Sequence, residues 1–212
     1  MVTKSASIAP SRYRKLAGMK VCGLTGGVGM GKSTAASFLL KAGYPVIDTD
    51  DLARELVQPG QPALREIRAV FGDGVFVPDG SLDRIALAKI VFSSTPARHS
   101  LESILHPRIR ELWLSQIERW RGSDLTVGFV VIPLLFETKA ESHFDSILCV
   151  GCSAGQQWQR LSRRGWTPEQ IKHRQAAQWT IEKKIAPSDF VVWTEGEPEV
   201  SNEQLRRIVS RL

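Results

Sequence analysis

A glycine-rich segment near the start of the chain carries the clearest chemical signal. Residues 26–34 read Gly-Gly-Val-Gly-Met-Gly-Lys-Ser-Thr and fit the phosphate-binding pattern GxxxxGK[ST]. Glycines let backbone N–H groups turn inward and approach phosphate oxygens closely. Lys32 can bridge the β- and γ-phosphates, and the Ser33 hydroxyl can ligate Mg²⁺. We therefore expect ATP and Mg²⁺ to bind at the nine loop residues: Gly26, Gly27, Val28, Gly29, Met30, Gly31, Lys32, Ser33 and Thr34.

Three aspartates, Asp48, Asp50 and Asp51, lie at the end of the next short apolar segment, which covers residues 44–48. If this segment is a strand of a parallel sheet, its carboxyl end faces the crevice in which ligands bind. An aspartate there can accept a hydroxyl proton or orient Mg²⁺ through water. We expect Asp48 and Asp50 to serve the chemistry, with either of them as the base and Asp48 as a water-mediated Mg²⁺ ligand. Asp51 is expected to cap the helix that follows.

A basic segment, residues 156–184, holds seven basic and two acidic side chains. Phosphoryl transfer is catalysed mostly by positioning, by charge stabilisation and by exclusion of water. Arg160 and Arg164 lie four residues apart, on one helix face, where guanidinium groups can clamp phosphates. We expect Arg164 to act in catalysis and Arg160 and Arg174 to bind the nucleotide. Lys184 is expected on a solvated basic face.

Apolar patterning predicts the elements that must position these groups. The run from 125 to 132 is nearly all apolar, which is typical of a central parallel strand covered on both faces. Helical spacing runs through residues 63–121 and again through 153–185. Strands that alternate with helices predict an α/β fold with a parallel sheet. Five strands are expected, at residues 20–25, 44–48, 125–132, 146–150 and 190–193.

The net charge of +6 is concentrated in two places. Residues 1–20 contribute +5 without an acid and residues 156–184 contribute +5, so the rest of the chain is acidic. Residues 1–18 are expected to form a disordered extension; synthesis that starts at Met19 and a transit segment remain the alternatives. No apolar run is long enough to predict a membrane helix. Three cysteines cannot form a disulfide framework, which favours a reducing, cytoplasmic location.

Two other classes of phosphate-loop protein are disfavoured. A GTPase needs an Asn-Lys-x-Asp guanine reader, but the one asparagine, Asn202, is followed by Glu203. ATPase motors usually place an aspartate at the end of an apolar strand to hold Mg²⁺, whereas residues 127–132 run into Pro133 without a carboxylate. These features favour a small-molecule kinase.

Several motifs, in order and spacing over about residues 20–205, together resemble dephospho-CoA kinase. The resemblance implies ATP-dependent phosphorylation of the ribose 3′-hydroxyl of dephospho-CoA, the last step of coenzyme A synthesis. It implies a P-loop NTPase-type three-layer core (19–58, 122–152 and 186–212), a helical CoA-side region (59–121) and a mobile lid (153–185). The motifs are the loop with Val46-Ile-Asp-Thr-Asp50, Leu101-Glu-Ser-Ile-Leu-His-Pro107, Pro133-Leu-Leu-Phe-Glu137, Gln159-Arg-Leu161, Arg164, Arg174 with Gln178, Lys183, and Ser188-Asp189.

The resemblance also suggests roles for single residues. Asp50 corresponds to the family's general base, and His106 to a residue on the substrate side; Arg84 and Arg108 are candidate contacts for the phosphates of CoA. The family often has an aspartate where this chain has Val131, so that carboxylate must be dispensable or supplied by Asp48 or Asp50. The family's Asn-x-Gly appears as residues 194–196, Thr-Glu-Gly, so this chain lacks the family's asparagine beside the expected adenine contacts.

Two alternative functions remain open. One is another nucleotide or small-metabolite kinase, which a substrate panel would reveal. The other is a nucleic-acid-binding protein on a P-loop fold, which predicts binding that weakens steeply with salt. For the kinase we expect dephospho-CoA and ATP as partners, no nucleic acid and no membrane, and a monomer or weak homo-oligomer.

Overall fold

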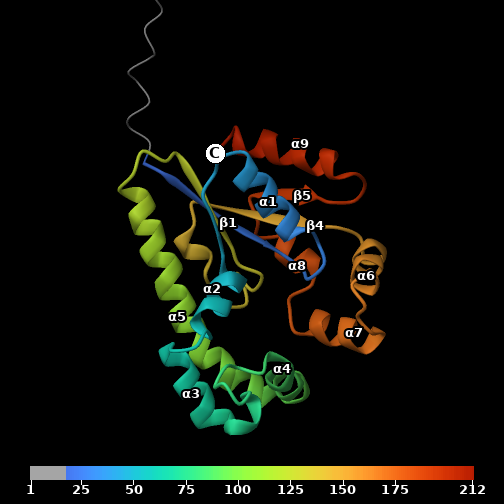
Figure 1. Ribbon diagram of the computed structural model, residues 1–212. Helices are drawn as coiled ribbons and strands as arrows, with labels where there is room; N and C mark the ends of the chain where they lie inside the picture. The colour runs from blue at the N-terminus through green and yellow to red at the C-terminus, as the bar shows by residue number, and fades with distance from the viewer. Residues whose placement is uncertain (1–17) are drawn as a thin grey trace, which may run out of the picture.

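A five-stranded parallel sheet forms the centre of the protein, in a computed structural model that describes residues 18–212 (Figure 1). The strand order is β2-β3-β1-β4-β5, which confirms the predicted α/β class. The predicted N-terminal extension lies outside the described residues, apart from Gly18. The strands are β1 (Lys20–Gly26), β2 (Val46–Asp48), β3 (Val127–Val131), β4 (Ser146–Gly151) and β5 (Phe190–Trp193).

Helices cover both faces of this sheet and make three layers. Along β3, Val127, Phe129 and Val131 enter one apolar core, whereas Val130 enters the other. Helices α1 (Lys32–Lys41) and α9 (Pro198–Val209) cover the first face, and α5 (Thr95–Arg121) covers the second (Figure 1). Both faces of β3 are buried, which explains why its sequence is continuously apolar.

A third apolar core lies at the far end of α5. It is built from Leu64, Ile67, Leu87 and Ile104, and it joins that end of α5 to three shorter segments. The helices around it are α2 (Thr49–Leu56), α3 (Pro62–Phe71) and α4 (Arg84–Ser93), with a 3-10 turn η1 at Asp73–Val75. Because α5 also packs against β3, one uninterrupted helix connects this region to the sheet.

Helix α5 continues through Pro107 without ending there. A proline inside a helix removes one hydrogen bond and crowds the preceding turn. Directly after the proline, Arg108 Nη1 donates to the carbonyl of Ile104 at 2.6 Å. The same guanidinium pairs with Glu66 of α3, so it ties this turn of α5 to α3.

The basic segment divides into two parts. Helices α6 (Ala154–Arg163) and α7 (Pro168–Ala176) form a pair beyond the carboxyl end of β4, whereas α8 (Ile181–Ile185) packs against β1 and β4. A second 3-10 turn, η2 (Glu141–His143), precedes β4. Among residues 18–212 we find no helix long and apolar enough to cross a bilayer.

The expectation that Lys184 is solvated is wrong. Its side chain is 0% exposed, and its Nζ lies 2.8 Å from Glu137 Oε1 and donates to the carbonyl of Pro133 at 2.7 Å. A buried ammonium requires such partners because desolvation of a lone charge is costly. Nothing in the charge run itself distinguishes this lysine from its neighbour Lys183, which is exposed.

We expect Glu137→Ala to lower the free energy of unfolding by about 3–5 kcal/mol, because it leaves the Lys184 charge buried without its counter-ion. Glu141→Ala, at an exposed position four residues away, serves as the control and should change stability by less than about 0.5 kcal/mol. Chemical denaturation of both variants measures the difference. A loss below about 1 kcal/mol for Glu137→Ala would contradict this account of the ion pair.

Candidate functional site

The loop between β1 and α1 has a backbone that only glycine accommodates at two points. Gly26 has φ 148°, and a Cβ there would lie 2.2 Å from the carbonyl oxygen of Val150. Gly31 precedes α1 in a left-handed conformation with φ 99° and supplies no capping side chain. The first turn of α1 contains no acid, so its N–H groups and its positive dipole end stay available to an anion.

Lys32 lies across this loop. Its Nζ donates to the carbonyls of Gly26 at 2.8 Å and Gly27 at 2.9 Å. Burial lowers the pKa of the ammonium to about 8, and the nearby carboxylate of Asp50 opposes that shift. The lysine is therefore held beside the anion site, and an arriving phosphate would supply the negative charge that stabilises its protonated form.

Two cavities open on either side of the loop. The larger, of about 390 Å³, reaches Val28, Lys32 and Asp50 and extends along α5. The smaller, of about 280 Å³, reaches Gly29, Gly31 and Thr34 and extends to α9. The larger cavity is lined by two acidic side chains, Asp50 and Glu102, whereas no acidic side chain among residues 18–212 lines the smaller one.

The aspartates after β2 have distinct positions. Asp48 caps α2, since its Oδ1 accepts the N–H of Asp50 at 2.9 Å, and its burial raises the pKa of the carboxyl. The expected cap, Asp51, instead pairs with Arg54, so that prediction is wrong. An aspartate immediately before the first helical turn caps better than one inside it. Asp50 lines the larger cavity, and its carboxylate has no hydrogen-bond partner among the described residues.

Val131, where the family often has an aspartate, is the direct partner of Asp48 in the pairing of β2 with β3. The carboxylate of Asp48 therefore belongs to the same edge of the sheet as the missing one. Thr49 also contacts this position, since its Oγ1 donates to the carbonyl of Val131 at 2.9 Å. This strand pairing is compatible with Asp48 taking the place of the carboxylate that the family often carries at the position of Val131.

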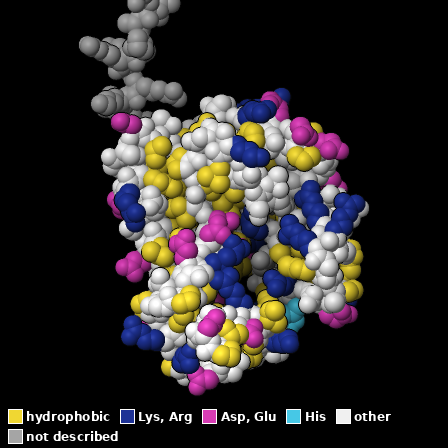
Figure 2. Space-filling model, viewed as in Figure 1, with side chains coloured by type: hydrophobic (Ala, Val, Ile, Leu, Met, Phe, Trp, Pro, Cys, Tyr) yellow, Lys and Arg dark blue, Asp and Glu magenta, His cyan; other side chains and the backbone are white. Residues whose placement is uncertain are grey.

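The predicted arginines divide between the two cavities. Arg160 and Arg164 line the smaller one, and Arg160 Nη1 donates to Thr194 Oγ1 at 2.9 Å. Arg174 lines the larger one, where its guanidinium lies between the rings of Phe92 at 4.4 Å and Trp166 at 4.2 Å. Lys and Arg side chains gather over α6 and α7 and beside the hollow that separates this pair from the rest of the protein (Figure 2).

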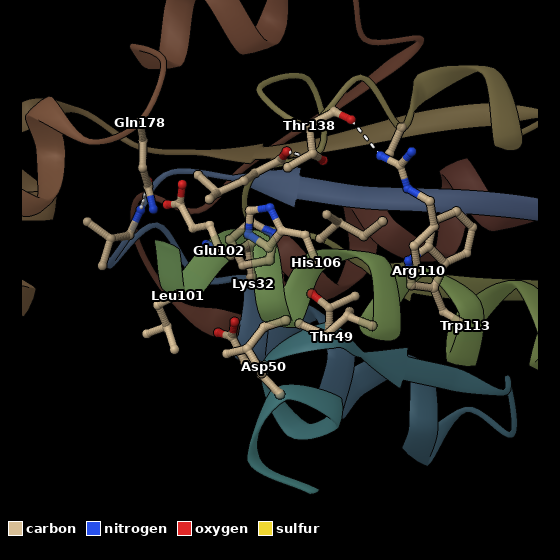
Figure 3. Close-up of a pocket in the computed structure, with 18 of the residues that line it drawn as sticks. Lys32, Thr49, Asp50, Leu101, Glu102, His106, Arg110, Trp113, Thr138 and Gln178 are labelled. Carbon is tan, nitrogen blue, oxygen red and sulfur yellow. Dashed lines mark hydrogen bonds between the residues drawn. The ribbon is translucent and has the colours of Figure 1, made fainter. Parts of the chain in front are cut away.

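One face of α5 forms the far wall of the larger cavity (Figure 3). Glu102, His106 and Arg110 follow one another at intervals of four residues, and Trp113 continues the row. Burial lowers the pKa of His106, and the carboxylate of Glu102 opposes that effect. Arg110 Nη2 donates to the carbonyl of Thr138 at 2.7 Å. Sequence analysis missed Arg110 and Trp113, although their helical spacing from His106 is the signal that places them.

Two predicted substrate contacts lie elsewhere. Arg108 points to α3, where it pairs with Glu66, and Arg84 is exposed at the start of α4 with Nη2 3.4 Å from the carbonyl of Arg54. Neither lines the larger cavity, so the structure does not bring them together with Asp50. Arg110 is the arginine of α5 that lines this cavity.

The loop offers few protein ligands for a metal. No cluster of three or more His, Cys, Asp or Glu side chains that could hold an ion occurs in residues 18–212. Ser33 is exposed at the start of α1, and Asp48 and Asp50 lie at the end of β2. This sparse donor set fits Mg²⁺, which keeps several waters and takes further oxygens from bound phosphates.

We expect the affinity for ATP to fall as the pH rises through about 8, because Lys32 then loses the charge that attracts phosphate. The loss should reach up to about tenfold for each further pH unit. Lys32→Arg stays charged at these pH values and should give a flatter profile. Isothermal titration calorimetry across this range measures both proteins, and parallel profiles would contradict the assignment to Lys32.

Comparison with known proteins places the chain in a family. The sequence profile described as dephospho-CoA kinase matches residues 20–199. The dephospho-CoA kinase of Anaeromyxobacter dehalogenans is 41% identical over 92% of this chain and 92% of its own, and that of Geobacillus kaustophilus is 38% identical over 89% and 94%. A solved Thermus thermophilus protein superposes with a TM-score of 0.78 at 32% identity, over 92% of this chain and 99% of its own. The chain belongs to the dephospho-CoA kinase family.

Proposed function

We propose that this protein transfers the γ-phosphoryl group of ATP to the 3′-hydroxyl of dephospho-CoA, which completes coenzyme A synthesis. The observation that carries the proposal is the larger cavity, which Lys32 of the phosphate loop and Asp50 line together. The rest of that cavity is lined mainly by apolar side chains of α5 and of residues 132–134, which directly follow β3. Such a lining suits the long arm of a CoA-type acceptor.

Asp50 is the residue that we assign as the base. Its carboxylate lines the cavity without a hydrogen-bond partner in the described part of the chain, whereas Asp48 is engaged as a helix cap. In this role Asp50 accepts the hydroxyl proton while the oxygen attacks phosphorus. Asp48 then acts by fixing the backbone of Asp50 through their 2.9 Å hydrogen bond.

The remaining groups bind and neutralise the phosphates. Backbone N–H groups of residues 26–34 and the ammonium of Lys32 would surround the β- and γ-phosphates. Arg160 is proposed to bind the nucleotide from the smaller cavity, where Arg164 would act in catalysis, and Arg174 is proposed to reach the phosphates from the larger cavity. Ser33 and, through water, Asp48 would hold Mg²⁺, which neutralises charge that develops on the transferred group.

Helices α6 and α7 are proposed to act as a lid. Arg160 of α6 and Arg164 directly after it line the smaller cavity, and Arg174 of α7 lines the larger one. Closure of this pair over the loop would exclude water that otherwise hydrolyses ATP. Helix α8 packs on the sheet, so the moving part of the predicted segment 153–185 would end before it. We further propose that the enzyme works in the cytoplasm as a monomer or weak homo-oligomer.

Two competing functions make different predictions. Another P-loop kinase would prefer a different acceptor, so a nucleoside monophosphate favoured over dephospho-CoA in a substrate panel would overturn our acceptor. A nucleic-acid-binding protein would show DNA or RNA binding that weakens steeply with salt. Arginines placed around a phosphate loop and its cavities favour the kinase.

For the base we expect Asp50→Asn to lower kcat by about 10²–10⁴ while the affinity for ATP changes little, because only proton removal from the acceptor is lost. ADP release coupled to dephospho-CoA measures the rate. Asp51→Asn is the matched control, since its carboxylate is exposed and pairs with Arg54, and it should retain full activity. Undiminished turnover in Asp50→Asn would remove Asp50 from the role of base.

A further inference from the structure

Two glutamines of the lid segment hold the backbone of one phosphate-loop residue, Val28, through its N–H and its carbonyl. The carbonyl of Val28 accepts from Gln157 Nε2 at 2.7 Å, and the N–H of Val28 donates to Gln178 Oε1 at 3.1 Å. Gln157 belongs to α6, whereas Gln178 follows the end of α7. Both ends of the lid segment therefore meet at the same residue of the loop.

The two glutamines differ in whether their side-chain amide has a hydrogen-bonding group without a partner. Gln157 is buried, and its Oε1 accepts from Gln175 Nε2 at 2.6 Å, so both ends of its amide are occupied. Gln178 lines the larger cavity together with Lys32 and Asp50. Its Nε2 has no hydrogen-bond partner anywhere in residues 18–212, so a free donor remains at the wall of the cavity (Figure 3).

Bound ATP would compete with the hydrogen bond that Gln178 makes. The N–H of Val28 is one of the loop donors that can serve a phosphate oxygen. When a phosphate oxygen takes this hydrogen, the carbonyl oxygen of Gln178 faces another acceptor and is repelled. Rotation of the terminal amide relieves this conflict because it brings Nε2 toward the phosphate.

The backbone beside Gln178 is anchored, which restricts the response to its side chain. The N–H of Trp179 donates to Glu137 Oε1 at 2.7 Å, and Glu137 pairs with the buried Lys184. The ring of Trp179 also stacks on Phe136, with centroids 5.9 Å apart and an interplanar angle of 9°. A fixed backbone with a rotatable amide is a suitable arrangement for sensing the group that occupies the loop.

We propose that Gln178 is a further catalytic residue, whose amide changes from acceptor of the Val28 N–H to donor toward the γ-phosphoryl group when ATP binds. The inference rests on the proposed function only in taking ATP as the phosphoryl donor, and it does not depend on the acceptor. In the donor state the amide stabilises charge on the transferring group and distinguishes ATP from ADP.

Two substitutions separate this role from a structural one. Gln178→Glu keeps an acceptor for the Val28 N–H, but it cannot donate to phosphate and adds a negative charge. Gln178→Met keeps the length and loses both hydrogen bonds. We expect kcat to fall roughly tenfold in Gln178→Met and at least roughly a hundredfold in Gln178→Glu. The matched control is Gln170→Glu, in the same lid, where Oε1 accepts the N–H of Thr167 and the charge change should leave kcat unaltered.

A binding measurement tests the same idea without any acceptor. Calorimetry with an ATP analogue that cannot transfer its γ-phosphate, compared with ADP, should give a preference for the analogue that shrinks several-fold in Gln178→Met and further in Gln178→Glu. This readout stays valid if dephospho-CoA proves not to be the acceptor. Wild-type turnover and binding in Gln178→Glu, with or without impairment of Gln178→Met, would overturn the proposal, since the bond to Val28 would then be only structural.

Discussion

The central constraint on this protein is that its phosphate loop must present backbone N–H groups to an anion, although those of Val28 and Met30 donate to Gln178 and Gly27. A buried donor without a partner is costly, so a loop of this kind adopts its shape only where the surroundings impose it. Here the carbonyl of Val150 excludes a side chain at Gly26, and Thr194 Oγ1 donates to the carbonyl of Met30 at 2.9 Å. Strand β4, the end of β5 and the lid all contribute contacts that hold the loop open.

Two lysines, Lys32 and Lys184, differ in the partners that the structure gives them. Lys32 and Lys184 are two ammonium groups near one another, and their mutual repulsion adds to the burial that lowers the pKa of Lys32. Lys184 has a carboxylate partner in Glu137, whereas Lys32 rests on two carbonyls that carry no formal charge. The lysine with an ion pair stabilises the scaffold, and the lysine without one remains available to an anionic ligand. Unequal pairing thus gives two identical side chains different tasks.

Sequence alone predicted the sheet, the phosphate loop and the family, because each depends on local pattern. A continuous apolar run marks β3, and glycine spacing marks the loop. Contacts between segments that are far apart in the sequence could not be predicted from local patterns. The burial of Lys184 depends on Glu137, which lies 47 residues earlier, and the position of Arg108 depends on Glu66, which lies 42 residues earlier. The residue that caps α2 is set by the position at which the helix begins, which is Thr49. A sequence pattern does not define a helix boundary to better than one or two residues, so it could not identify the capping aspartate.

Helix α5 has a mechanical consequence. At about 1.5 Å per residue its 27 residues span about 40 Å, with one end embedded against β3 and the other in the core that holds α3 and α4. Such a helix is a lever, and a tilt of about 5° at the sheet displaces the opposite tip by about 3.5 Å. Glu102, His106 and Arg110 lie along the middle of this lever, so a small rotation would change the width of the larger cavity.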